Sequence, residues 1–256
     1  MIAVIVPIYN TEKYLRETID SVICQTLSFA EHIRLILLDD ASTDGSFAIC
    51  EQYQKQYPKQ IVVKHYDTNQ GVSALRNEGV RIAGEMGDEL ITFLDSDDKL
   101  ADDAMEKAVQ YFDAHEDVFV AAIGIRYFDA YEGEQRLNWR FEKTDVVDIK
   151  KDYTYPHYYV GGVFLRHAVL DELHFDESLS FWEDALAVNQ VIVSQGKYGL
   201  IAGTHYYYRK REDESSLVDT AWHKKERYTT LLSSGYGQLF AYSRKKHHRI
   251  IPYVQW

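Results

Sequence analysis

The sequence predicts an α/β protein built on a doubly wound, mostly parallel sheet. Short apolar runs alternate with amphipathic stretches through the first half of the chain. The apolar runs are rich in β-branched residues and nearly continuous, as strands buried on both faces are. With 256 residues, 46% of them hydrophobic, the chain is long enough for one large core, or for one core with a small appendage.

Four strand–helix pairs are predicted in the first half of the chain. The strands are expected at residues 2–6, 33–38, 61–66 and 89–94. The helices are expected at residues 11–25, 44–57, 71–86 and 101–115, with Thr11 and Asp44 as N-caps. Right-handed crossovers would join such units into one sheet with helices on both faces.

The second half of the chain is less regular. We expect strands at residues 118–128, 160–166 and 198–208, and helices at residues 167–173 and 184–194. A tyrosine-rich stretch at residues 153–159 fits no element. The alternation stops near Arg209, so the sequence predicts a main domain at residues 1–208 and a loop and helical extension at residues 209–256.

Composition excludes several classes of function. The net charge is −12, which argues against a protein that binds nucleic acid broadly. The two cysteines, Cys24 and Cys50, have no metal-ligand spacing and are expected to be ordinary free thiols. The first ten residues lack the basic start of a signal peptide, and no apolar run reaches the roughly 20 residues of a membrane span.

Carboxylates follow two of the predicted strands. Asp39 and Asp40 end the second strand, and Asp95, Asp97 and Asp98 end the fourth. Ligands of doubly wound sheets lie beyond the carboxyl ends of the strands. Clustered carboxylates repel one another unless a cation neutralises them, and their oxygens suit Mg²⁺ or Mn²⁺ held together with substrate phosphates. The alternative is that these aspartates are helix caps and turn formers.

Five segments occur in the order seen in family-2 glycosyltransferases, which this sequence resembles. They are VIVPIYN (4–10), LLDDASTDGS (37–46), NQGVSALRNEGV (69–80), FLDSDD (93–98) and FWEDALAVNQ (181–190). The resemblance implies the GT-A fold of nucleotide-diphospho-sugar transferases. It also implies an inverting, metal-dependent transferase that moves a sugar from a UDP-sugar to a hydroxyl of a surface polysaccharide or related glycan.

The resemblance assigns one group of residues to the nucleotide. Pro7 and Tyr9 would line the base pocket, and Asp40 would hydrogen-bond the pyrimidine ring. Asn69 would help to fix the nucleoside, and Arg76 would approach the diphosphate.

A second group is assigned to the chemistry. Asp95 would lie near the ribose or metal-bound water, and Asp97 would ligate Mn²⁺ or Mg²⁺. Asp184 matches the catalytic base, while Glu183 and Trp182 would shape the acceptor side. Inversion in one displacement needs one carboxylate to accept the acceptor proton. An N-cap is the other role open to Asp184.

Two features near residue 209 remain open. Residues 208–217 resemble a loop that closes over the donor diphosphate, with Arg209, Arg211 and Ser215 as candidate ligands; a solvated charged loop is the alternative. His205 could complete the metal shell, although an ordinary strand histidine is the favoured interpretation.

Two other functions compete with a glycosyltransferase. One is a non-catalytic polymer-binding module that keeps the fold, against which the carboxylates Asp95, Asp97 and Asp184 argue. The other is a sugar-phosphate nucleotidyltransferase, but the loop after the first strand, PIYNTEKYL, contains no glycine. The sequence does not distinguish a hexose from an N-acetylhexosamine donor, and the acceptor, a glycan or lipid-linked chain, is also left open.

The C-terminal end of the sequence combines charge with apolar surface. Residues 243–249 are basic, and residues 250–256 are apolar and aromatic. We expect the chain to be part of a longer protein. The alternatives are a homo-oligomer that packs through this segment and peripheral contact with an anionic membrane. The expected location is the cytoplasm, with the inner face of the membrane as the place of such contact.

Overall fold

A computed structural model describes residues 1–135, 138–149, 151, 157, 159–179 and 182–211. The predicted extension from residue 212 onward lies outside the described residues, and so do Ser215, the basic segment and the apolar end. Most of the tyrosine-rich stretch at 153–159 also lies outside them, except for His157 and Tyr159.

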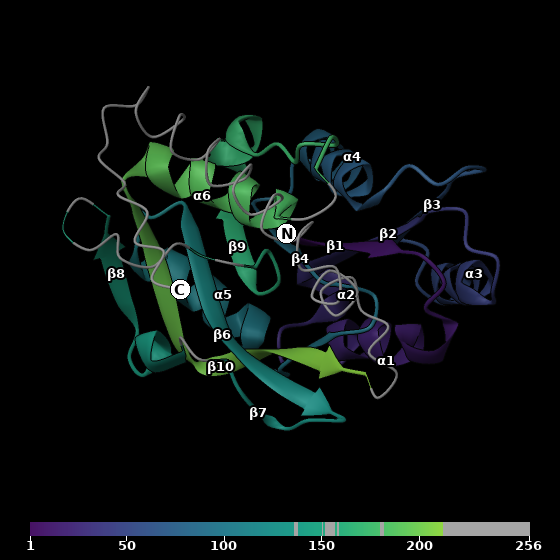
Figure 1. Ribbon diagram of the computed structural model, residues 1–256, viewed down its shortest axis with the longest axis horizontal. Coiled ribbons are helices and arrows are strands. Elements are labelled where there is room, and N and C mark those ends of the chain that lie inside the picture. The colour runs from purple at the N-terminus through teal and green to yellow at the C-terminus, as the bar shows by residue number, and fades with distance from the viewer. Residues whose placement is uncertain (136–137, 150, 152–156, 158, 180–181, 212–256) are drawn as a thin grey trace, which may run out of the picture.

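The described residues form one ten-stranded mixed sheet in the order β3-β2-β1-β4-β9-β6-β10-β5, with β7 beside β6 and β8 beside β10 (Figure 1). The strands are β1 (Ile2–Ile8), β2 (Ile33–Asp39), β3 (Ile61–His65), β4 (Leu90–Phe93), β5 (Lys99–Leu100), β6 (Val120–Asp129), β7 (Gly133–Glu134), β8 (Asp145–Asp148), β9 (Val163–Arg166) and β10 (Lys197–Lys210).

Most of the long strands run in the same direction. Strands β3, β2, β1 and β4 pair in parallel, and β6 pairs in parallel with β10. Strand β9 is antiparallel to both β4 and β6, so it joins the two parallel sets without reversing them. The carboxyl ends of β1, β2, β4, β6 and β10 therefore lie at the same edge of the sheet, where a ligand is expected.

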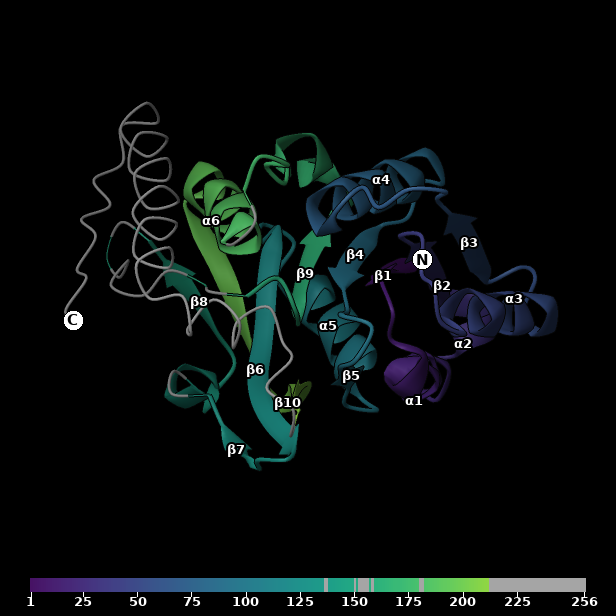
Figure 2. The same cartoon turned by 45° about the vertical axis from the view of Figure 1, so that its right-hand side comes forward.

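Helices cover both faces of the sheet. They are α1 (Glu12–Ile23), α2 (Phe29–His32), α3 (Ser46–Gln56), α4 (Val72–Glu85), α5 (Ala104–Ala114) and α6 (Glu183–Gln195), with 3₁₀ turns at Asn138–Phe141 and His167–Glu172. Helices α1, α3 and α5 bury one core layer, and α4 and α6 bury the other. Figures 1 and 2 show α4 and α6 together on one face of the sheet.

The predicted doubly wound architecture agrees with this structure. Each predicted strand and helix is present within a few residues of its expected bounds. The sequence missed the two-residue strands β5 and β7 and the one-turn helix α2, because segments this short carry no readable periodicity. It also missed β8, whose sequence DVVD has only two apolar residues. Strand β10 continues to Lys210 and so crosses the predicted boundary at residue 208.

Asp44 fixes the start of two helices. Its Oδ1 accepts a hydrogen bond from the Ser46 amide at 3.0 Å, and its Oδ2 accepts one from the Glu12 amide at 3.0 Å. Gly45 holds the N-cap position of α3, so the N-cap predicted for Asp44 is wrong; Asp44 bonds the first amide of α3 from one position further out. Thr11 holds the N-cap position of α1 as predicted, but its side chain makes no cap bond.

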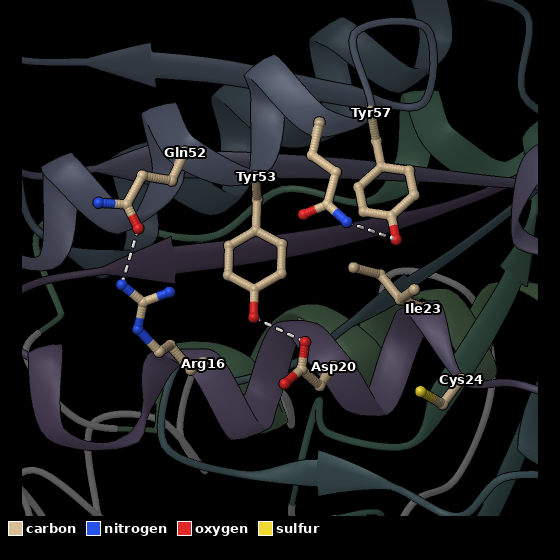
Figure 3. Close-up of a pocket in the computed structure, with 8 residues that line it drawn as sticks. Arg16, Asp20, Ile23, Cys24, Gln52, Tyr53 and Tyr57 are labelled. Carbon is tan, nitrogen blue, oxygen red and sulfur yellow. Dashed lines mark hydrogen bonds between the residues drawn. The ribbon is translucent and has the colours of Figure 1, made fainter.

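A groove lies between α1 and α3, apart from the predicted site residues (Figure 3). Tyr53 donates a hydrogen bond to Asp20 at 2.6 Å, and Arg16 donates one to Gln52 at 2.8 Å across the groove. The exposed Cys24 lies on its wall, while Cys50 is buried, and both thiols are free as predicted.

Within the described part of the chain, no helix is long and apolar enough to cross a membrane.

Candidate active site

The predicted site residues come from neighbouring strand ends and two helix starts. Tyr9 follows β1, Asp40 follows β2 and Asp95 follows β4, and these three strands are adjacent and parallel. Arg76 lies in the second turn of α4, and Asp184 is the second residue of α6. The fold therefore brings together residues that are up to 175 positions apart in the chain, from Tyr9 to Asp184.

Asp40 and Asn69 lie together, as the resemblance implies. The buried Asp40 carboxylate accepts hydrogen bonds from the backbone amides of Gln70 at 2.6 Å and Gly71 at 2.9 Å. The Asn69 side chain donates to the Asp40 carbonyl at 3.4 Å. Asp40 thus fixes the loop that leads into α4, a structural role that sequence reasoning did not predict.

Tyr9 is exposed, in contrast to the nearby Pro7. Its side chain is 52% exposed, whereas Pro7 is buried in β1 beside Leu38 of β2. The neighbouring Asn10 has a left-handed backbone with φ of 53°, and its Oδ1 accepts a hydrogen bond from the Thr43 amide at 2.8 Å. This cross-link holds the ends of β1 and β2 together and leaves the Tyr9 ring open to a ligand.

Sequence reasoning missed a contact between Asp39 and His65 beside these residues. Asp39 is fully buried, and its Oδ2 lies 2.7 Å from Nδ1 of His65 at the end of β3. The Phe47 ring stacks on His65 with centroids 4.2 Å apart. The parallel register that sets Asp39 beside His65 would have been the only signal, and it requires knowing the strand order.

Arg76 connects the Asp95 turn with the start of α6. Its guanidinium donates to Asp95 at 3.1 Å and to Glu183 at 2.9 Å, and the side chain is almost completely buried. Burial disfavours the charged guanidinium, yet Asp95 and Glu183 raise the pKa of Arg76 above its ordinary value. Arg76 is therefore directed at two site carboxylates, rather than at open solvent as a diphosphate ligand would be.

Asp184 lies in the first turn of α6, next to Glu183. Burial, followed by repulsion from Glu183, raises the pKa of Asp184 to about 7, although Arg76 acts in the opposite direction. Its Oδ2 lies 3.4 Å from the Val160 amide. The N-cap position of α6 belongs to Trp182, in a left-handed conformation with φ of 70°, so the alternative role of Asp184 as N-cap is wrong.

Asp97 is paired with a cation from its own chain. Two guanidinium nitrogens of Arg211 donate to Oδ2 of Asp97, at 2.9 and 2.6 Å. Burial raises the pKa of Asp97; Arg211 lowers it, and Asp95 raises it further. Arg211 is thus placed beside the predicted metal ligand.

The Asp95–Asp97 pair fits a divalent cation. Its hard carboxylate oxygens suit Mg²⁺ or Mn²⁺. Within the described residues, no group of three or more His, Cys, Asp or Glu side chains could hold a metal. A bound ion would therefore need further oxygens from phosphates and water, which is how Mg²⁺ is usually held.

His205 lies in β10 beside Tyr207, which agrees with an ordinary strand histidine.

Arg209 does not lie in a loop, which corrects the sequence prediction. It is the second-last residue of β10 and is buried. Its guanidinium pairs with Glu17 of α1 and Asp129 of β6, and its Nε donates to the Asp97 carbonyl at 2.6 Å. Burial works against its charge, while Asp129 and Glu17 raise the pKa of Arg209.

Solved structures share this arrangement of the sheet. S. aureus TarS 1–349 in complex with UDP-GlcNAc is 26% identical, covers 82% of this chain and 59% of its own, and has a TM-score of 0.72. The mannosyltransferase PcManGT from Pyrobaculum calidifontis, solved with GDP-Man and Mn²⁺, covers 98% of this chain and 65% of its own with a TM-score of 0.68. Its 18% identity shows the fold alone. The fold and site define the class as a GT-A glycosyltransferase.

A family model described as "Glycosyl transferase family 2" matches residues 3–174, and the chain belongs to that family. The minor teichoic acid biosynthesis protein GgaA of Bacillus subtilis is 42% identical over 258 residues, which cover 100% of this chain and 57% of GgaA. The related GgaB of the same organism is 40% identical over 86% of this chain and 24% of GgaB. The chain therefore spans less than two thirds of either relative.

Proposed function

We propose that this chain transfers a hexose or N-acetylhexosamine, with inversion, from a UDP-sugar to a hydroxyl of a growing teichoic-acid-type polymer. The observation that carries the proposal is the Arg76 bridge, which ties Asp95 at the expected diphosphate site to Glu183 beside Asp184. This bridge gives the base and the leaving-group site a fixed spacing, as a single displacement requires.

The proposed step begins with Asp184, which accepts the proton of the acceptor hydroxyl. The hydroxyl oxygen then bonds to the anomeric carbon from the face opposite the diphosphate. The bond between that carbon and the β-phosphate oxygen breaks, and UDP departs with the bonding electrons. A pKa of about 7 suits Asp184 to this task near neutral pH.

The leaving diphosphate gains negative charge, which the site must stabilise. We propose that Asp97, with Asp95 nearby, holds Mn²⁺ or Mg²⁺ for this purpose. When bound, the ion would supply positive charge to the phosphate oxygens. Arg211 would move from Asp97 toward the same diphosphate, and Arg76 would act on it through Asp95, which it contacts at 3.1 Å.

We propose that Tyr9, Pro7, Asp40 and Asn69 bind the uridine. The exposed Tyr9 ring offers a stacking surface at the end of β1. Among the structural relatives, TarS 1–349 was solved with UDP and with UDP-GlcNAc, which supports a uridine donor. Because the polymer-making relatives are named for teichoic acid synthesis, we place the reaction in the cytoplasm, with a glycan or lipid-linked acceptor.

Release of UDP from a panel of UDP-sugars tests the function, measured with Mn²⁺, with Mg²⁺ and with EDTA. The reaction should need one of the ions, and GDP should compete with the donor more weakly than UDP. UDP binding without transfer to any glycerol-phosphate or sugar-phosphate polymer would favour the binding module instead. Release of pyrophosphate from UTP and a sugar phosphate would indicate a nucleotidyltransferase.

A further inference from the structure

The turn that carries Asp95 and Asp97 is held by side chains from outside it. Residues 95–98 follow β4, and the Asp98 amide donates to the Asp95 carbonyl at 3.0 Å, which closes the turn. Thr18 of α1 donates to the Ser96 carbonyl at 3.0 Å. Short turns of this kind do not keep one conformation by themselves in water, so the outside contacts decide how the two carboxylates point.

Tyr206 of β10 contacts both ends of this turn. Its hydroxyl donates to Asp98 Oδ2 at 2.7 Å and accepts a hydrogen bond from the Asp95 amide at 3.1 Å. Tyr206 is almost fully buried. Its ring lies against Gly161, where an added Cβ would stand 2.6 Å from the ring carbon Cζ. The absence of a Cβ at Gly161 therefore leaves the space that the Tyr206 ring occupies.

Arg209 holds the middle of the same turn. Its backbone amide donates to Asp98 Oδ1 at 2.7 Å, and its Nε donates to the Asp97 carbonyl at 2.6 Å. The two remaining guanidinium nitrogens pair with Glu17 and Asp129. All three guanidinium nitrogens thus have protein partners, and the side chain also stacks near Tyr14 and Phe128, at 4.7 and 4.4 Å from the ring centroids.

Asp98 is the group on which these contacts converge. It is buried, and burial, followed by repulsion from Asp97 and Asp95, raises its pKa well above the ordinary value. Both of its oxygens are hydrogen-bonded, one to Tyr206 and one to the Arg209 amide. A carboxyl that is buried with both oxygens hydrogen-bonded stabilises the turn, and it is not accessible to a metal ion.

We propose that Tyr206 and Arg209 are positioning residues that hold the Asp95–Asp98 turn in the geometry that binds the cation, and that Arg209 does not contact the donor. This inference rests on the proposed metal-dependent transfer. It reassigns an arginine that the sequence placed among the donor ligands, and it adds a tyrosine to which no role had been given.

Tyr206→Phe tests the hydroxyl while the ring still fills its slot. With UDP present, calorimetry should show Mn²⁺ binding weakened at least about tenfold, because hydrogen bonds to charged groups are usually worth that much. UDP affinity in EDTA should stay the same. Gly161→Ala, which displaces the ring, should have the same effect. Wild-type Mn²⁺ affinity in Tyr206→Phe, with the fold retained, would overturn the proposal.

Arg209→Gln separates positioning from donor binding. A positioning role predicts loss of the Mn²⁺-dependent part of UDP binding alone, whereas equal loss of UDP affinity in EDTA would make Arg209 a donor ligand and contradict the proposal. Arg126→Gln is the matched control, because Arg126 lies in β6 and pairs with Glu134 at 3.5 Å at the surface. If Arg209→Gln does not fold, the results for Tyr206→Phe and Gly161→Ala decide whether the proposal stands.

The failure of the proposed metal dependence has a different signature. Wild-type protein would then transfer sugar equally well in EDTA and bind no Mn²⁺ with UDP. In that case Tyr206→Phe must still lower kcat, with the KM for the donor little changed and Arg126→Gln normal. An unchanged kcat in Tyr206→Phe would reject the positioning role as well.

Discussion

Arg211 bonds Asp97 through two nitrogens at 2.9 and 2.6 Å, so the predicted metal ligand carries an internal counterion. Asp97→Ala removes the carboxylate that we propose as the ion's main protein ligand. Transfer should fall by about two orders of magnitude or more, since stabilisation of the leaving group is lost. UDP release in Mn²⁺ measures this, with circular dichroism to confirm folding.

Asp117→Ala is the control for this substitution, because Asp117 is an exposed carboxylate paired with Lys197 away from the turn. Its turnover should match the wild type. Full Mn²⁺-dependent turnover in Asp97→Ala would remove Asp97 from the site.

The pKa of about 7 for Asp184 predicts how the rate depends on pH. Only the ionised carboxylate can accept a proton, so kcat should rise about tenfold per pH unit below 7 and level off above it. In Asp184→Asn this rise of kcat with pH should be absent, and kcat should fall at least about a hundredfold while donor affinity is kept. If calorimetry shows that UDP-sugar affinity falls as far as turnover, Asp184 is a binding residue.

The Arg76 bridge should contribute to stability as well as to geometry. Arg76→Gln leaves Asp95 and Glu183 without their partner, and breaking a buried pair in this way costs about 3 kcal/mol or more. Urea unfolding measures the loss. Arg81→Gln, on the exposed face of the same helix, is the control and should be close to wild type. Equal effects of the two substitutions would show that the bridge is not stabilising.

Gly79 sets how closely α4 approaches β1. A Cβ at this position would stand 2.3 Å from Cγ2 of Ile5, so Gly79→Ala should destabilise the fold by about 1–3 kcal/mol through overpacking. Gly84→Ala in the same helix meets its nearest atom only at 4.0 Å. That change should be neutral or stabilise by up to about 1 kcal/mol, because alanine favours helix. Thermal melting of both variants measures these changes in stability. A Gly84→Ala variant that is less stable than Gly79→Ala would contradict the prediction.

Local patterns in the sequence were sufficient for the long elements and for the family. Apolar periodicity predicted the long strands and helices because burial of one face acts within each segment. The strand-end positions predicted that Asp40 and Asp95 share one edge, since parallel strands end together. Asp184 was predicted only through the resemblance to the family. Short pieces such as β5 and β7 had no such signal.

Only the tertiary structure decided what each charged side chain contacts. Arg209 and Arg211 are two residues apart and were given the same role, yet one is buried between Glu17 and Asp129 while the other pairs with Asp97. Arg76 meets Glu183, 107 positions away. An ion pair forms where the packing of distant elements brings opposite charges together and excludes water, and no pattern within one segment of the chain records that.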